Sequence, residues 1–359
     1  MAKFLSFDSK LGKISIGNGF PCFVVAEMSA NHNGNLKRAR SIIHGAASAG
    51  ANAIKLQTYL PSTMTIDCEK DYFKVQSKTG PQDWNKSLYS LYQSAHTPWE
   101  WHKELKELTE SLGMIFFSTP FDSTSVDFLE ALNVPLYKVA SYELTDLPLL
   151  KKIASTKKPI ILSTGFASLE EISEAMQTLR DSNVEQIALL YCVTNYSDNP
   201  DFKTTNLSTI QDLASRFNVV VGFSDNTGGI DIPLQAVDCG ASILEKHIKL
   251  DEDFEATDAS FSISMTDFGN LVMKIRQQEL IFGEPFYGVR NENEAYFRNF
   301  RRSIFIVRDI QEGEIFTEDN IRVIRPAYGL EPKHYEVILG KISKVDISRG
   351  TPLDWNHVK

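Results

Sequence analysis

The chain has 359 residues, of which 42% are hydrophobic and 23% are charged, ordinary proportions for a folded globular protein. A disordered chain, a collagen-like repeat and a disulfide-stapled miniprotein are therefore excluded, and the length predicts about two domains. The formal charge of −9 argues against a nucleic-acid-binding protein, because such proteins usually carry a basic excess.

Cysteine spacing and hydropathy indicate the compartment. The four cysteines form no CxxC pair, so the sequence predicts neither a zinc knuckle nor a disulfide framework. Reduced thiols fit the cytoplasm. The N-terminus has no apolar segment of signal-peptide length, and no apolar run approaches the ~20 residues of a membrane helix. We expect a cytoplasmic protein with neither membrane nor nucleic acid as a partner.

Short apolar runs alternate along the chain with amphipathic segments. The runs predict buried parallel strands at Phe23–Glu27, Ala53–Gln57, Ile115–Thr119, Leu136–Ala140, Pro159–Ser163, Ile187–Tyr191, Val219–Phe223 and Ser242–Lys246. The amphipathic segments predict helices at Leu36–Ala47, Glu100–Leu112, Ser125–Leu132, Leu169–Leu179, Ser208–Phe217, Ile230–Asp238 and Asp267–Phe282. This alternation predicts an α/β fold, a (β/α)8 TIM barrel. An open doubly wound sheet is the alternative, but it would normally show GxGxxG after its first strand, where this chain has MSANHNG.

Two stretches depart from this alternation. The connection from Thr58 to Trp99 is too long for a plain loop, which is typical of a lid, a binding loop or an oligomer contact. Its aromatic-rich part, residues 83–101, is interpreted as packing. Beyond the barrel domain, residues 1–285, a polar and turn-rich linker is expected at 286–301. Residues 302–359 then show short strands and turns, which predict a small second domain.

Two lysines lie inside predicted buried strands. In an eightfold barrel the active site forms at the C-terminal ends of the strands, where Lys55 and Lys138 fall. A buried ammonium is costly unless an anion meets it, so we interpret the pair as a receptor for phosphate or carboxylate. Hydroxyl donors would surround it at Ser118, Thr119, Ser141 and Ser163. Two alternatives stay open: pairing with a carboxylate such as Glu27, and a Schiff-base lysine.

Seven ordered motifs resemble the sialic acid (nonulosonic acid) synthase family. They are AExxxNHxG (Ala26 to Gly34), IKLQ (Lys55, Gln57), FSTPFD, KVAS, LSTG, GFSD and ILEKH (Glu245 to His247). The tail DIQEGEIFTEDNIRVIRP resembles the C-terminal antifreeze-like (SAF) domain of that family. Within the family, QTYLPSTMTID and SLYSLYQSAHTPWEWHKEL are similar to the branch that makes pseudaminic acid.

The resemblance implies a TIM barrel with a SAF domain, in a domain-swapped homodimer. The implied reaction condenses phosphoenolpyruvate with an amino-sugar, 2,4-diacetamido-2,4,6-trideoxy-altrose, to give pseudaminic acid and phosphate. Two alternatives remain. One is a synthase of N-acetylneuraminate or legionaminate acting on N-acetylmannosamine or a related sugar, and the other is a sugar-binding homologue of low activity.

The resemblance also assigns roles to residues. Glu27 and Glu143 match positions that contact the sugar or the reacting centre, and Arg325 of the SAF domain matches an arginine that reaches the neighbouring subunit's sugar. Asp258 lies in a substrate loop, and Gln57 belongs to the IKLQ motif. The positions that match phosphoenolpyruvate-binding residues are Lys55, Thr119, Lys138, Ser141, Ser163, Tyr196 and Ser224.

A divalent metal (Mn²⁺, Mg²⁺ or Co²⁺) is the implied cofactor. His247, which is also a catalytic candidate, matches one of two metal-binding histidines of the family, and Asn226 stands at the position of the other, because this chain reads SDN where the family usually reads SDH. An asparagine carbonyl can bind a hard ion, although it is a weaker ligand than imidazole for softer ions. The substitution therefore raises the question of metal identity and activity.

Overall fold

The computed structural model describes residues 4–75, 87–197, 201–252 and 255–359. Two compact units make up the chain, Met1–Gly283 and Glu284–Lys359. Within the described residues, no helix is both long enough and apolar enough to cross a membrane.

The first unit is a closed barrel of eight parallel strands, as the sequence predicts. The sheet runs in the order β3-β4-β5-β6-β7-β8-β9-β10, and β10 pairs with both β9 and β3, which closes the ring. The alternative of an open sheet is therefore wrong. The strands are β3 (Phe23–Glu27), β4 (Ala53–Thr58), β5 (Ile115–Pro120), β6 (Tyr137–Val139), β7 (Ile160–Ser163), β8 (Ile187–Ser197), β9 (Val220–Thr227) and β10 (Ile243–Lys249).

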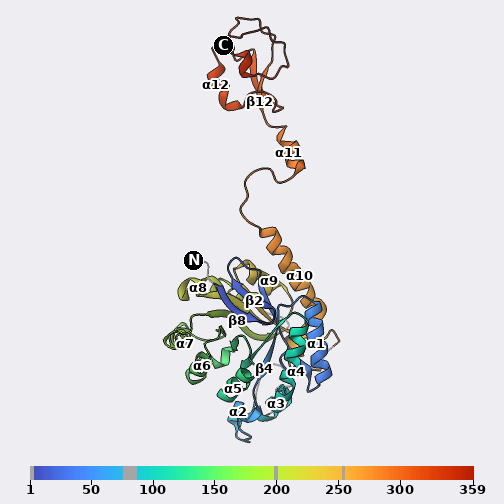
Figure 1. The fold of residues 1–359 in the computed structure, drawn as a ribbon, viewed down its shortest axis with the longest axis vertical. Helices are drawn as coiled ribbons and strands as arrows, with labels where there is room; N and C mark the ends of the chain where they lie inside the picture. The colour runs from blue at the N-terminus through green and yellow to red at the C-terminus, as the bar shows by residue number, and fades with distance from the viewer. Residues whose placement is uncertain (1–3, 76–86, 198–200, 253–254) are drawn as a thin grey trace. The chain divides into compact units, whose positions relative to one another are not determined.

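A helix follows each strand on the outside of the ring (Figure 1). Side-chain caps start several of these helices: Asn35 accepts from the first backbone amides of α1, and Asp122 does the same for α5. The helices are α1 (Leu36–Ser48), α4 (Trp99–Ser111), α5 (Ser123–Ala131), α6 (Leu147–Ala154), α7 (Leu169–Asp181), α8 (Ser208–Phe217), α9 (Asp231–Asp238) and α10 (Met265–Phe282). The sequence analysis missed α6, the helix between β6 and β7.

Strand alternation divides the buried side chains into two cores. Val24 and Ala26 of β3 point outward and join the large cluster between strands and helices, while Phe23 and Val25 point into the barrel. The interior cluster is smaller because the inward-facing positions near the carboxyl ends of the strands carry polar side chains. The same alternation turns Lys55 inward, since it shares a face of β4 with Ala53 of the interior cluster.

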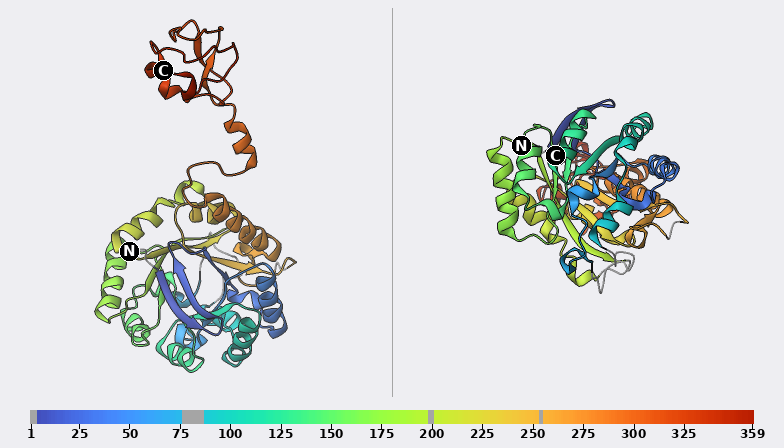
Figure 2. Two further views of the ribbon diagram at one scale, coloured as in Figure 1. Left: turned by 45° about the horizontal axis from the view of Figure 1, so that its top comes forward. Right: turned by 90° about the horizontal axis from the view of Figure 1, so that it is seen from below.

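An N-terminal hairpin that the sequence analysis did not predict closes one end of the barrel. Strands β1 (Phe4–Ser9) and β2 (Gly12–Gly17) pair antiparallel, and the hairpin, drawn in blue, lies across the ring in the left view of Figure 2. Its side chains Leu5, Phe7 and Ile16 belong to the interior cluster. The hairpin therefore acts as an apolar plug.

The second unit is small and has a core of its own. Strands β12 (Ser303–Ile306) and β13 (Ile321–Ile324) pair antiparallel, and its buried cluster includes Ile304, Phe316 and Leu353. Other predicted strands form only isolated bridges, such as Ile315 with Ile342. The expected linker contains a short helix, α11 (Glu292–Arg298), capped by Asn291.

Candidate active site

A cavity of about 380 Å³ opens where the barrel strands end, and it collects most of the predicted site residues. The inward-facing side chains form an apolar layer inside the barrel and a polar layer at the carboxyl ends of the strands. Polar side chains from consecutive strands therefore meet at the cavity. The predicted residues that line it are Lys55, Gln57, Lys138, Ser141, Glu143, Ser163, Ser224, Asn226, His247 and Asp258.

Lys55 stands at the centre of a charged group. Its Nζ lies 2.6 Å from Glu27 Oε2 and 3.6 Å from Glu245 Oε1, and it donates to Thr119 Oγ1 at 3.2 Å. The pairing with Glu27 raised as an alternative is thus present, and Lys55 faces the cavity as well. Burial lowers the pKa of Lys55, but the charges of Glu245 and Glu27 outweigh it, so the net pKa is raised and the side chain stays cationic.

Lys138 is the second cation, and it lacks a close carboxylate of its own. Its Nζ donates to Ser163 Oγ at 2.6 Å and to the Val139 carbonyl at 2.8 Å, while Glu245 Oε1 is 4.0 Å away. Burial lowers the pKa of Lys138, which Glu245 partly offsets. Two ammonium groups therefore share Glu245, which also accepts a hydrogen bond from Ser224 at 3.1 Å. Such a group is suited to an anionic ligand.

Two buried carboxyls, Glu143 in the cavity wall and Glu27 beside Lys55, have pKa values raised toward neutrality. Burial raises the pKa of Glu27 to about 7 against the opposing charge of Lys55, and Gln57 donates to Glu27 Oε1 at 3.2 Å. Burial likewise raises the pKa of Glu143 to about 7. Glu143 Oε2 is buried, and no hydrogen-bond partner is found for it among the described residues. A carboxyl that titrates near neutral pH is suited to accept or donate a proton.

His247 and Asn226, the two residues expected to bind a metal ion, lie on neighbouring strands and both line the cavity. In the parallel register Lys246 lies opposite Asp225, so the next residues of β10 and β9 are neighbours at the cavity. His247 Nδ1 is buried without a hydrogen-bond partner in the described part of the chain. Among these described residues, no group of three His, Cys, Asp or Glu side chains forms a metal site. The donors present thus fit an ion with two protein ligands.

A buried ion pair fixes the strands that carry these donors. Lys246 and Asp225 point away from the barrel interior, and their charged atoms lie 2.7 Å apart with both side chains fully buried. Lys246 also donates to the Thr227 carbonyl, and Thr227 in turn donates to Asp225. The pair joins β9 to β10 directly behind Asn226 and His247.

The long β4–α4 connection forms one wall of the cavity. It contains α2 (Pro61–Met64) and α3 (Leu88–Ala95), and seven of its residues line the cavity: Tyr59, Met64, Val75, Leu88, Leu91, Tyr92 and Ala95. Trp99 stacks on Phe128, which is packing as expected. Tyr92 packs edge-on against Tyr59 and also lines the cavity, while residues 83–86 of the aromatic-rich segment lie outside the described residues.

Some site residues were missed, and some predicted ones lie elsewhere. Ser29 was not among the predicted site residues, and Glu245 was noted at a strand end in the ILEKH motif but was given no role, although it shares a strand face with His247 and lines the cavity. Asp258 accepts hydrogen bonds from Ser29 and from the Ala30 amide. The side chain of Tyr196 lies outside the described ones. Arg325 belongs to the second unit and directly follows β13, and its peptide bond with Pro326 is cis.

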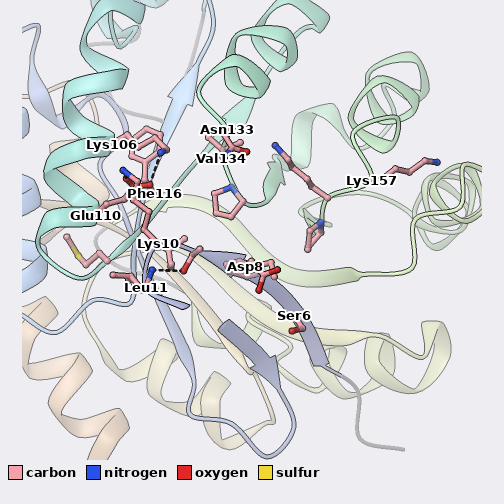
Figure 3. A pocket seen from close by; sticks show the side chains of 17 residues that line it. Ser6, Asp8, Lys10, Leu11, Lys106, Glu110, Phe116, Asn133, Val134 and Lys157 are labelled. Carbon is pink, nitrogen blue, oxygen red and sulfur yellow. Dashed lines mark hydrogen bonds and ion pairs between the residues drawn. The ribbon is translucent and has the colours of Figure 1, made fainter. Parts of the chain in front are cut away.

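A larger cavity, about 530 Å³, lies at the opposite end of the barrel (Figure 3). It is lined by the plug hairpin and by residues just before β5, β6 and β7, so it is remote from the strand ends that carry the candidate chemistry. Glu110 in its wall binds Lys10 at 2.6 Å and Lys106 at 2.7 Å. Because this cavity is at the end of the barrel away from the carboxyl ends of the strands, we place the active site in the smaller cavity.

Comparisons with known proteins agree with this geometry. The model of the NeuB family matches residues 42–286, and the SAF domain model matches residues 301–359. The pseudaminic acid synthase of Helicobacter pylori is 41% identical over 94% of this chain and 98% of its own length. The N,N'-diacetyllegionaminic acid synthase of Legionella pneumophila is 34% identical over 96% of each chain. The crystal structure of the N-acetylneuraminic acid synthetase of Leptospira borgpetersenii, in complex with citrate, matches with a TM-score of 0.70 and 30% identity, covering 83% of this chain and 98% of that one.

Proposed function

The chain belongs to the NeuB family, and from this premise we propose that it condenses phosphoenolpyruvate with a 2,4-diacetamido-2,4,6-trideoxy hexose, giving pseudaminic acid and phosphate. The observation that carries the proposal is the pair of buried lysines, Lys55 and Lys138, beneath a cavity at the strand ends. Phosphoenolpyruvate carries a phosphate and a carboxylate, and both need cationic partners. The relative from Helicobacter pylori, named a pseudaminic acid synthase, supports the choice of sugar.

Lys55 and Lys138 hold phosphoenolpyruvate in this scheme. Their ammonium groups offset its negative charge, and hydroxyl donors complete the receptor at Ser141, Ser163 and Ser224. Because both lysines are fixed by short contacts in a buried layer, the enol carbon C3 is held in one orientation toward the sugar aldehyde.

His247 and Asn226 are the residues that we assign to a divalent ion, Mn²⁺, Mg²⁺ or Co²⁺. Such an ion, when bound, supplies Lewis-acid polarisation of the sugar aldehyde. The unpartnered Nδ1 of His247 is the observation that favours the assignment. The ion pair between Asp225 and Lys246 keeps the two strands in register for it.

The carbon–carbon bond forms when C3 of phosphoenolpyruvate attacks the sugar aldehyde, and positive charge develops at C2. Water adds at C2, and the tetrahedral intermediate loses phosphate by cleavage of the C–O bond. Glu27 or Glu143 positions that water or a sugar hydroxyl, and the unpaired oxygen of Glu143 in the cavity supports this role. Oxygen-18 in the enol-phosphate bridge tests this step: we expect the label in phosphate, and its recovery in the sugar acid contradicts C–O cleavage.

A panel of amino-sugars tests the whole proposal. Phosphate release is measured with phosphoenolpyruvate and each of three sugars: the 2,4-diacetamido-2,4,6-trideoxy-altrose, the legionaminate precursor and N-acetylmannosamine. We expect the altrose sugar to give the highest kcat/KM. Borohydride reduction in the presence of pyruvate is the control for a Schiff-base aldolase, because that mechanism alone leaves a mass adduct on Lys55 or Lys138. If neither the wild type with Mn²⁺ nor the Asn226→His variant releases phosphate, the chain is the sugar-binding homologue of low activity.

We also propose a homodimer and a cytoplasmic location. Large apolar side chains are exposed along residues 280–300, including Leu280 (82%), Phe282 (89%) and Tyr287 (95%). A run of this kind is typical of a surface that a second chain covers. In the dimer Arg325 of one subunit would reach the sugar in its partner's barrel. All four cysteines are free, which fits a reducing compartment.

A further inference from the structure

One face of α3 is apolar and lines the cavity. Leu88, Leu91, Tyr92 and Ala95 follow the spacing i, i+3, i+4 and i+7, which places them on one side of a helix. Ser90, Gln93 and Ser94 are exposed on the other side. An apolar helix face normally packs against the core, but this face borders the active-site cavity. It is therefore available to apolar groups of a ligand.

The cavity consequently has two chemically different sides. Its floor, at the strand ends, carries the charged and hydroxyl groups around Lys55 and Lys138. Its apolar wall is formed by the α3 face together with Met64, Val75 and Phe121. Tyr59 joins the parts of this wall, because its ring makes edge-on contacts with Tyr92 at 5.7 Å and with Phe121 at 5.4 Å.

We propose that the α3 face selects the sugar by its methyl groups, above all the methyl at C6. The inference rests on the proposed function. Phosphoenolpyruvate occupies the charged floor, and the sugar's reacting carbon C1 must lie next to it, so the far end of the sugar is directed toward the wall. A methyl group at C6 is stabilised there. A hydroxyl at C6 would lose its water without finding a partner on Leu88, Leu91 or Ala95.

Two matched sugars test the inference on the unmodified protein. They are the 2,4-diacetamido-2,4,6-trideoxy-altrose and its counterpart with a hydroxyl at C6, each assayed with saturating phosphoenolpyruvate. We expect kcat/KM to favour the 6-deoxy sugar by about tenfold or more, the usual discrimination of an apolar pocket. Equal kcat/KM values overturn the inference and leave the proposed function standing. Turnover of neither sugar overturns the proposed function and the inference with it.

Variants of α3 then locate the selection. Leu91→Ala shortens the most buried side chain of the face, which is 8% exposed, and Leu88→Ala does the same at a half-buried position where folding is not at risk. We expect each to raise KM for the 6-deoxy sugar several-fold, to reduce the preference over the 6-hydroxy sugar, and to leave KM for phosphoenolpyruvate unchanged. Gln93→Ala, on the exposed side of the same helix, is the matched control. An unchanged sugar preference in Leu88→Ala and Leu91→Ala overturns the assignment to α3.

Discussion

At the scale of single residues, the site is a polar layer above an apolar one. Along the barrel strands the inward-facing side chains are apolar first and polar toward the cavity: Leu136, just before β6, belongs to the interior cluster, and Lys138, two residues later, lines the cavity. Buried charges of this kind cost stability, because desolvation is only partly offset by their partners. The layer is therefore suited to ligand binding at the expense of stability.

Replacement of Lys138 tests this balance. Lys138→Met keeps most of the side-chain volume and removes the buried charge, so we expect kcat/KM for phosphoenolpyruvate to fall by about 100-fold or more. The thermal midpoint should stay the same or rise, because an ammonium that is 1% exposed is no longer desolvated. Steady-state kinetics and a thermal melt measure the two effects. Loss of activity accompanied by a lower midpoint indicates a structural role instead.

Glu143 gives a pH dependence whose sign follows from its raised pKa. Its carboxyl has an ordinary pKa of 4.5 and a pKa of about 7 in the fold. Between these values the folded protein binds more protons than the unfolded chain, so this group lowers the free energy of unfolding as pH rises from about 4.5 to about 7. Glu143→Gln removes that loss. The free energy of unfolding of the variant, relative to that of the wild type, should therefore be up to about 3 kcal/mol higher at pH 8 than at pH 4. Urea unfolding at both pH values is the measurement, and parallel curves contradict it.

The same variant tests the catalytic role of Glu143. If its carboxylate positions the water that adds at C2, kcat of the wild type rises with pH through about 7, where the group loses its proton. Glu143→Gln should lower kcat by about 10- to 100-fold and remove this acid limb. A pH–rate profile that keeps the limb in the variant assigns it to another group, of which Glu27 is the first candidate.

Site residues could be predicted from the sequence where a charged side chain falls inside a strand that is expected to be buried. Lys55 and Lys138 stood out because a lysine inside an apolar strand demands a partner. Glu245 did not, since a carboxylate near the end of a strand is unremarkable until the barrel closes and brings it between two lysines. Tyr59 and Leu91 were missed for a related reason. An apolar side chain that lines a cavity has the same sequence signature as one that packs in a core.

At the scale of elements, the eight barrel strands were predicted because both of their faces are buried. β5, for example, is buried along its whole length. Helix α6 was missed because its eight residues, LPLLKKIA, make only about two turns, although Leu149, Leu150, Ile153 and Ala154 form one buried face. The hairpin was missed because its alternation is broken by polar turns and no neighbouring strand marks it as part of the barrel.

The plug hairpin should affect stability without affecting chemistry. Ile16 is fully buried in the interior cluster, so Ile16→Ala is expected to lower the free energy of unfolding by about 2–5 kcal/mol. Leu11→Ala, at the half-exposed hairpin turn, is the matched control with little expected effect. Both variants should keep the wild-type kcat well below their melting temperatures, because the hairpin closes the end opposite the active site. A fall in kcat of Ile16→Ala at low temperature contradicts this separation.

At the scale of the whole molecule, two folded units have different tasks. The barrel carries the charged cavity, and the small unit carries Arg325, which we assign to a partner's site. The net charge of −9 gave no indication of an anionic substrate, because the receptor consists of a few buried cations. The short strands and turns of residues 302–359 predicted a small second unit, and the resemblance of the tail identified it as a SAF domain.

Subunit mixing tests the shared site. Lys138→Met disables its own barrel, and Arg325→Ala disables the contribution to its partner, so each variant alone should be nearly inactive. When the two variants are coexpressed with separate tags, half of the dimers contain one subunit of each kind. Each mixed dimer has one barrel that keeps its own Lys138 and receives Arg325 from its partner. Recovery of about a quarter of wild-type activity is therefore expected for a symmetric pair. No recovery in purified mixed dimers shows that Arg325 serves its own barrel or neither.

The position of α3 has an evolutionary consequence. The helix lies in the connection between β4 and α4, so its sequence can vary without disturbing a barrel strand or the buried ion pair between Lys246 and Asp225. Substitutions in this connection can therefore change which sugar an evolving enzyme accepts while the condensation reaction stays the same. For protein engineering, residues 59–95 are the segment to exchange: replacing them with those of a relative changes the apolar wall, and with it the sugar that is accepted.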